Sequence, residues 1–129
     1  MGMDVYGIFQ RREQGQWELI DRFIDSQRGA LRHWLGLSEL SPFPTRGLPV
    51  DFISCHKQKR PRKSRTPELE RIEYVYVGTE WQSWATADEV LNASTEMIDY
   101  GSEEITDFKQ LVLSLGQQHG EIRFVWGFS

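Results

Sequence analysis

The 129-residue sequence lacks several features that define common classes of protein. Cys55 is the only cysteine, so the chain cannot form an internal disulfide, and a reducing compartment is the simplest setting. No apolar run approaches the length of a membrane span, and the first residues lack the apolar segment of a signal peptide. We therefore expect a cytoplasmic protein with no membrane partner.

The sequence also lacks the short motifs that accompany common chemistries. Gly-x-Ser-x-Gly and the glycine-rich phosphate loops are absent. Cys55 and His56 are adjacent, a spacing that rarely ligates one ion, and no CxxC or HxxxH pattern includes His33 or His119. The paired carboxylates stand at predicted helix starts, where acidic residues complement the helix dipole. We predict no metal, no cofactor and no catalytic residue, and we favour a non-enzymatic protein.

Aromatic residues, in contrast, are abundant. The chain holds five Trp, seven Phe and four Tyr, and 39% of its residues are apolar. This is enough to build one hydrophobic core, so we expect a single domain over residues 1–129. The net charge of −4 argues against a general nucleic-acid-binding protein, whose binding surface is usually basic.

Hydrophobic periodicity predicts an α+β fold. Alternating apolar residues predict strands at 3–9, 17–23, 72–77 and 122–128, with a hairpin turn at 11–16. Helical spacing predicts helices at about 25–35, 86–91 and 102–116, and a short helix starting at Pro49. Thr86 and Glu89 have the spacing of a capping box. We expect about four strands in a largely antiparallel sheet, with two or three helices packed on one face.

Three stretches do not follow a regular period. Residues 38–49 hold three prolines and one glycine, which predicts an irregular loop. Residues 56–71 predict a basic, flexible loop, because six cations fall within nine residues. Residues 78–86 predict an aromatic elbow between a strand and a helix, with Trp81 exposed and Trp84 beneath the helix start.

These stretches supply the candidate ligand-binding residues. The cations of the basic loop would clasp phosphates, unless the loop is merely solvated; the candidates are Lys59, Arg60, Arg62 and Lys63. Trp81 and Trp84 would stack on a base or anchor a protein, with capping of the sheet edge as the alternative.

Two arginines complete the set of candidates. Arg46 lies in the irregular loop and Arg123 on an otherwise apolar strand, so each needs a partner if it is buried. A carboxylate such as Asp4 or Asp51 would make a structural ion pair, and anion binding is the alternative. We expect Arg46 to be held by a carboxylate or a carbonyl, and Gly47 to adopt a conformation that favours glycine.

Five short segments of the chain carry a family resemblance. They are MGMDVYGIF, GQWELI, RGLPVDF, WQSWATADEVL and IRFVWGFS, in that order. Together they are similar to a family of small uncharacterised proteins from tailed phages and prophages. Histidine is expected near the Ser-Trp element and after the first Asp, where this chain has Trp81, Gln82 and Tyr6. The resemblance implies a phage setting and an accessory role against host defence, but no reaction.

Two classes of function remain open from the sequence. The first is a non-catalytic binding protein that sequesters an anionic nucleotide or a host defence protein, and a second copy of the chain is a further candidate partner. Acid-rich stretches at 68–80 and 99–107 also fit mimicry of nucleic acid. The second is a small nucleotide hydrolase with a carboxylate or His33 as its base. The lack of a catalytic motif favours the first class.

Overall fold

A four-stranded antiparallel sheet forms the centre of the molecule. The computed structural model describes residues 3–26, 29–52, 55–61 and 70–129. The strands of the sheet are β1 (Val5–Glu13), β2 (Gln16–Ser26), β5 (Glu80–Thr86) and β6 (Ile122–Phe128). Their order is β2-β1-β6-β5, and all three pairings are antiparallel. The predicted α+β fold, with a four-stranded antiparallel sheet, is confirmed.

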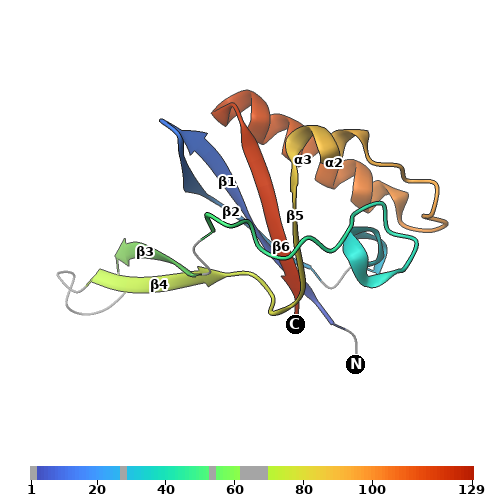
Figure 1. Cartoon of the computed structure of the whole chain (residues 1–129), viewed down its shortest axis with the longest axis horizontal. Coiled ribbons are helices and arrows are strands. Elements are labelled where there is room, and N and C mark those ends of the chain that lie inside the picture. The colour runs from blue at the N-terminus through green and yellow to red at the C-terminus, as the bar shows by residue number, and fades with distance from the viewer. Residues whose placement is uncertain (1–2, 27–28, 53–54, 62–69) are drawn as a thin grey trace.

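Helices cover one face of this sheet (Figure 1). They are α1 (Gly29–Arg32), which continues into the wide helical turn η1 (His33–Leu37), then α2 (Ala87–Asn92) and α3 (Ser102–His119). Two further strands, β3 (Cys55–Pro61) and β4 (Glu70–Tyr76), pair with each other in a separate antiparallel ribbon. In the part of the chain that the structure describes, no helix is long and apolar enough to cross a membrane.

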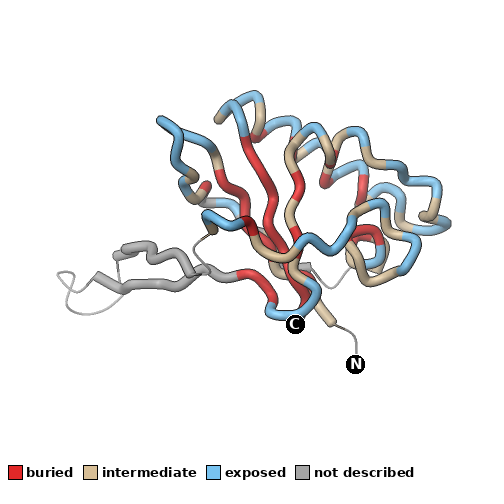
Figure 2. Tube along the Cα trace, viewed as in Figure 1, coloured by how far each residue is buried: buried red, intermediate tan, exposed pale blue. Residues whose placement is uncertain are grey.

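The main core lies between the sheet and the helices. Alternate residues of β6 point to this side, and they meet the apolar stripe of α3. Phe124 is central, because its ring lies 4.7 Å from that of Phe9 and 5.0 Å from that of Phe108. Figure 2 shows buried residues along β1 and β6, the two inner strands. Burial of these aromatic rings is the main apolar contribution to stability.

The opposite face of the sheet is covered by the second half of the loop of residues 38–52, since Phe43 in its first half packs in the main core. Ile8 and Val125 are fully buried on this face, where Leu48 and Phe52 of the loop pack against them. The loop crosses the outer edge of β5, where the Gly47 amide donates to the Gln82 carbonyl at 2.9 Å. Figure 1 shows the loop crossing in front of β5 and β6. The proline-rich segment is therefore an ordered layer of the fold.

Both outer strands of the sheet are irregular. The pairing of β2 with β1 changes register between Ile8 and Gln10 of β1. The pairing of β5 with β6 changes register between Glu80 and Ser83 of β5. Such bulges interrupt the row of backbone groups that another strand would need for pairing. The chain also passes very close to β6 just before β5, since a Cβ on Gly127 would lie 2.0 Å from the Gly78 carbonyl oxygen.

Several predicted boundaries were wrong. The elbow at 78–86 is largely strand β5, which supplies the fourth strand of the sheet, while the 72–77 strand lies in β4 and pairs with β3. The hairpin turn is shorter than predicted and consists of Gln14 and Gly15, both at positive φ. The last helix continues through Gly116 to His119.

Two other predictions concern the loops. The segment after Pro49 forms one hydrogen-bonded turn instead of a helix, with the Phe52 amide donating to the Pro49 carbonyl. Residues 55–61 form strand β3, so the first part of the predicted basic loop is extended backbone. Residues 62–69 of that loop lie outside the described residues.

Candidate functional site

Trp81 is displayed by the bulge in β5. One extra residue between Glu80 and Ser83 breaks the pairing with β6, and Trp81 adopts a left-handed backbone with φ of 46°. Its side chain is 51% exposed, as predicted. A bulky residue in this conformation costs about 1–3 kcal/mol, so the surrounding contacts must hold it there. The bulge leaves the indole about half exposed at the edge of the sheet, which marks this position as a candidate site.

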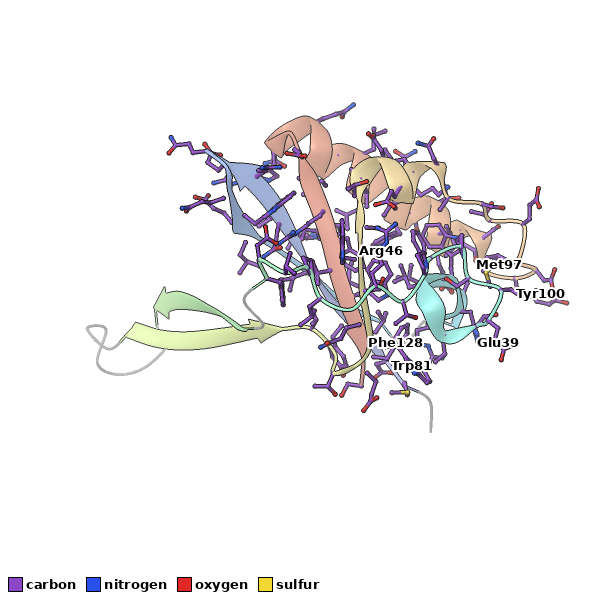
Figure 3. All side chains as sticks on the ribbon, in the orientation of Figure 1. Glu39, Arg46, Trp81, Met97, Tyr100 and Phe128 are labelled. Carbon is purple, nitrogen blue, oxygen red and sulfur yellow. The ribbon has the colours of Figure 1, made fainter. Side chains whose placement is uncertain are left out.

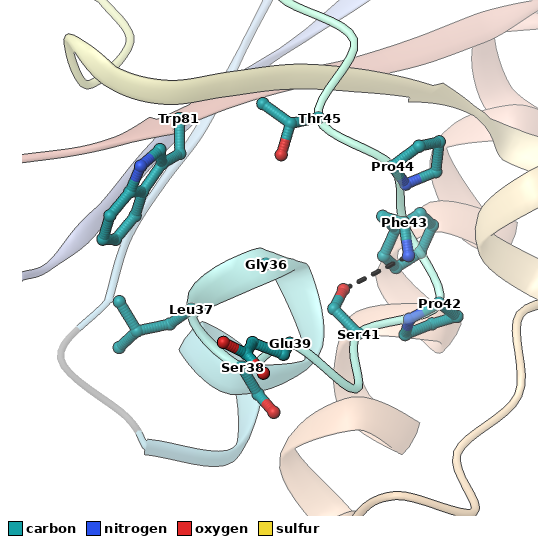
Figure 4. A pocket seen from close by; sticks show the side chains of 10 residues that line it. All are labelled: Gly36, Leu37, Ser38, Glu39, Ser41, Pro42, Phe43, Pro44, Thr45 and Trp81. Atoms are coloured by element: carbon teal, nitrogen blue, oxygen red, sulfur yellow. Dashed lines mark hydrogen bonds between the residues drawn. The ribbon is translucent and has the colours of Figure 1, made fainter.

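The Trp81 indole forms one wall of a cavity of about 720 Å³. In Figure 4 the indole faces the proline-rich loop across an open space, and η1 closes another side. The remaining lining residues are Gly36, Leu37, Ser38, Glu39, Ser41, Pro42, Phe43, Pro44 and Thr45. Glu39 is the only charged residue among them. The cavity is therefore of mixed character, lined by aromatic rings and prolines together with hydroxyl groups and one carboxylate.

A second hollow of about 350 Å³ adjoins the first, because Ser38 lines both. Leu40 and Tyr100 line this hollow and are 74% and 90% exposed. In Figure 3, Glu39, Met97 and Tyr100 lie at the right-hand end of the molecule, and Trp81 lies at its lower edge. We call this region the Trp81 surface, and define it as Trp81, Leu40, Tyr100 and the residues that line the two hollows.

The Trp81 surface is acidic at its edges. Glu39 lines the first hollow and Asp99 the second, while exposed Glu80 precedes Trp81 in the chain. Neither hollow is lined by Lys or Arg, although His33 contributes to the second. Large exposed apolar side chains beside carboxylates are suited to an apolar and cationic ligand, and a phosphate would be repelled.

Arg46 lies apart from the Trp81 hollow and is held by Glu89. Its Nη1 donates to Glu89 Oε1 at 2.9 Å, and Nη2 donates to Oε2 in a two-pronged pair. Nη1 also donates to the Trp84 carbonyl at 3.2 Å, and the guanidinium lies 4.8 Å from the centre of the Trp84 ring. The predicted carboxylate and carbonyl partners of Arg46 are thus observed, and Gly47 has the expected positive φ of 75°.

Glu89 also completes the predicted capping box of α2. Its carboxylate accepts from the Thr86 amide at 3.1 Å, and the Thr86 hydroxyl accepts from the Glu89 amide at 3.2 Å. The hydrogen bond from Arg46 is the main cause that lowers the pKa of Glu89 to about 2. The carboxylate is therefore an anion with its partners already in place, which makes it unsuited to general acid–base catalysis at neutral pH.

Arg123 is a buried cation, only 4% exposed, on the loop-covered face of the sheet. Its Nε donates to Gln10 Oε1 at 2.7 Å and its Nη1 to Asp51 Oδ1 at 3.0 Å, while the guanidinium lies 4.1 Å from the centre of the Trp17 ring. Desolvation lowers the pKa of Arg123, and the bond to Asp51 opposes this shift. Asp51 is one of the two partners considered from the sequence.

The structure separates the predicted site residues into three places. Arg46 and Trp84 contact each other, Arg123 contacts Trp17, and Trp81 stands in its own hollow. Lys59 and Arg60 belong to β3, for which the structure describes only the backbone, and Arg62 and Lys63 lie outside the described residues. No pattern in the sequence marked Leu40 or Tyr100 as site residues, since isolated apolar residues in loops are common.

Comparison with known proteins does not assign a function to these residues. No family model, no curated protein and no solved structure matches the chain. The resemblance to tailed-phage proteins therefore stays a prediction. Among the described residues, no three side chains of His, Cys, Asp or Glu gather in a way that could hold a metal ion.

Proposed function

We propose that this protein is a non-catalytic binding protein that sequesters another protein on its Trp81 surface. The observation that carries the proposal is the half-exposed Trp81 indole, which a costly backbone conformation holds over a 720 Å³ cavity. Exposed apolar residues that gather beside a hollow often mark an interaction site. Trp and Tyr are also the residues that most often dominate the energy of a protein–protein interface.

The charges favour a protein over a nucleotide as the ligand. Arg46 is engaged by Glu89 and would have to break this ion pair to bind a phosphate. Arg123 is engaged by Asp51, and its Nη2, which has no hydrogen-bond partner among the described residues, is buried away from solvent. The Trp81 surface itself contributes carboxylates from Glu39 and Asp99. A partner with apolar and basic side chains is complementary to this surface.

The resemblance to phage accessory proteins suggests a setting for this activity. We propose a bacterial defence protein as the target and the cytoplasm of the infected cell as the place of binding. A protein that works by sequestration needs a stable docking surface and no catalytic residues. This is in keeping with the lack of catalytic motifs in the sequence.

Site-specific photo-crosslinking tests the proposal. A benzophenone amino acid replaces exposed Leu40 in the second hollow, or exposed Gln110 on α3 as a matched control. We expect a discrete adduct in bacterial cells from position 40 and not from position 110. The captured protein is then identified by mass spectrometry, purified and bound in vitro.

Binding of the purified partner decides the outcome. Tyr100→Ser should weaken binding by at least about tenfold, the effect of an interface residue worth more than about 1.4 kcal/mol. Gln110→Ser should leave binding unchanged. Equal adducts from both positions would refute docking on this surface. The same conclusion would follow if neither Tyr100→Ser nor Trp81→Ser changed the affinity for the partner.

A further inference from the structure

Several tryptophan rings in this chain have the cationic group of an Arg or Lys side chain positioned over them. Arg123 lies 4.1 Å from the ring centre of Trp17, Arg46 lies 4.8 Å from that of Trp84, and Lys109 lies 5.6 Å from that of Trp34. Trp126 is fully buried and stacks on Phe124. In the described part of the chain, Trp81 alone combines substantial exposure with the lack of a cation over its ring.

The two arginine pairs also share a carboxylate. Arg46 binds Glu89 while it lies over Trp84, and Arg123 binds Asp51 while it lies over Trp17. A guanidinium suits this arrangement because its flat face stacks on an indole while its edge donates to a carboxylate. The chain thus contains two examples of a Trp–Arg–carboxylate cluster.

The first hollow contains two of these three parts. Trp81 forms one wall, and its packing on Phe128 is edge-on, with ring centres 6.1 Å apart. Glu39 lines the same hollow, and no hydrogen bond or ion pair joins its carboxylate to any residue that the structure describes. In Figure 4 the Thr45 hydroxyl points into the open space between these walls.

We infer that this hollow receives an arginine side chain of the bound protein. The guanidinium stacks on the Trp81 indole and donates to Glu39, and its alkyl stem packs against Phe43 and the prolines of the loop. The inference rests on the proposed docking function and specifies the chemistry that the partner must present. Arginine is favoured over lysine because an ammonium group offers neither a flat face nor a two-pronged edge.

Small probes test this inference without the partner. N-acetyl-arginine amide is titrated into 15N-labelled protein, and the Trp81 indole N–H resonance is assigned by its loss in Trp81→Phe. We expect a saturable shift with millimolar affinity. N-acetyl-citrulline amide, a neutral probe of the same shape, should bind at least about fivefold more weakly, since it lacks the charge.

A variant of Glu39 tests whether its carboxylate binds the arginine probe. Glu39→Gln should weaken the arginine probe by about fivefold or more and leave the citrulline probe unchanged. Asp107→Asn is the matched control, because Asp107 is an exposed acid on α3 outside the hollow, and it should change neither probe. Equal binding of arginine, lysine and citrulline amides, or no shift at Trp81, would overturn the arginine assignment.

The two proposals fail in different ways. If the arginine probe does not bind but Tyr100→Ser still abolishes binding of the crosslinked partner, the pocket assignment is wrong and docking stands. If the probe binds at Trp81 but no adduct forms at position 40, the hollow recognises a guanidinium, but the docking proposal is wrong and the arginine does not come from a docked protein.

Discussion

Replacing Glu89 by glutamine tests the central ion pair of the loop-covered face. Glu89 accepts two hydrogen bonds from Arg46 and one from the Thr86 amide. Glutamine keeps the shape and an oxygen acceptor for Thr86 but loses the charge. The variant therefore removes the ionic part of the Arg46 contact while the capping box can persist.

The expected loss of stability is modest. A pKa lowered from 4.5 to about 2 would correspond to about 3 kcal/mol if solvent did not screen the pair. The side chains of Arg46 and Glu89 are 30% and 37% exposed, so screening by water and salt reduces this value. We expect Glu89→Gln to lower the free energy of unfolding by about 1 kcal/mol at neutral pH.

The loss must also depend on pH in a defined direction. Because the pKa of Glu89 is lowered in the folded state, its contribution is complete above about pH 4.5 and disappears as the pH falls toward 2. Urea unfolding followed by tryptophan fluorescence, at several pH values across this window, measures the effect. The stability gap between wild type and Glu89→Gln should close at the acid end.

Asp88→Asn is the matched control, since Asp88 stands in the same first helical turn. It tests for a general effect of charge near the helix dipole. If the gap between wild type and Glu89→Gln stayed constant from neutral pH to about pH 2, the ion pair would not be the source of the lowered pKa, and the reasoning would be refuted.

Three further substitutions test the packing, and the free energy of unfolding is measured for each. Gly116→Ala is the reference variant, because a Cβ added there meets no atom within 4 Å. Gly127→Ala should cost at least about 3 kcal/mol, because its Cβ would lie 2.0 Å from a backbone oxygen; a neutral result would disprove the close approach. Gly47→Val should cost about 1 kcal/mol or more from its positive φ alone, since no atom lies within 4 Å of its Cβ, and a neutral result would mean that the loop relaxes. Trp84→Ala should cost about 3 kcal/mol, because Trp84 packs against the cluster of Ile8 and Val125 and carries the Arg46 guanidinium; a loss below about 1 kcal/mol would show that Trp84 is peripheral.

Patterns among residues close in the sequence predicted the elements that such residues are enough to form. The capping box at Thr86 and Glu89 forms with both of its hydrogen bonds, because its two side chains are only three residues apart. The apolar stripe of α3 reflects one buried face, and the helix starts where it was predicted and ends three residues later. Strand β6 is buried on both faces, and it lies where its alternating aromatic residues predicted it.

Strand β5 could not be predicted from such patterns in its own sequence. Its sequence, EWQSWAT, contains one extra residue at the bulge, which breaks the alternation that identifies a strand. The strand exists because Ser83 and Ala85 pair with Trp126 and Phe124 of β6, about forty residues later in the chain. Pairing over this distance leaves no signal in a single sequence, and the same bulge decides that Trp81 is exposed.

The partner of Arg46 was equally hidden, whereas Asp51, the partner of Arg123, was one of the two carboxylates considered from the sequence. Each arginine was predicted to bind an anion or a carboxylate, and the observed carboxylates come from α2 for Arg46 and from the loop itself for Arg123. Both ion pairs fix the loop of residues 38–52, at Arg46 and at Asp51, so their first role is structural. The same loop carries Glu39 and Phe43 into the Trp81 hollow. Arg46 and Arg123 therefore stabilise the wall of the proposed binding site from a distance, without contacting what binds there.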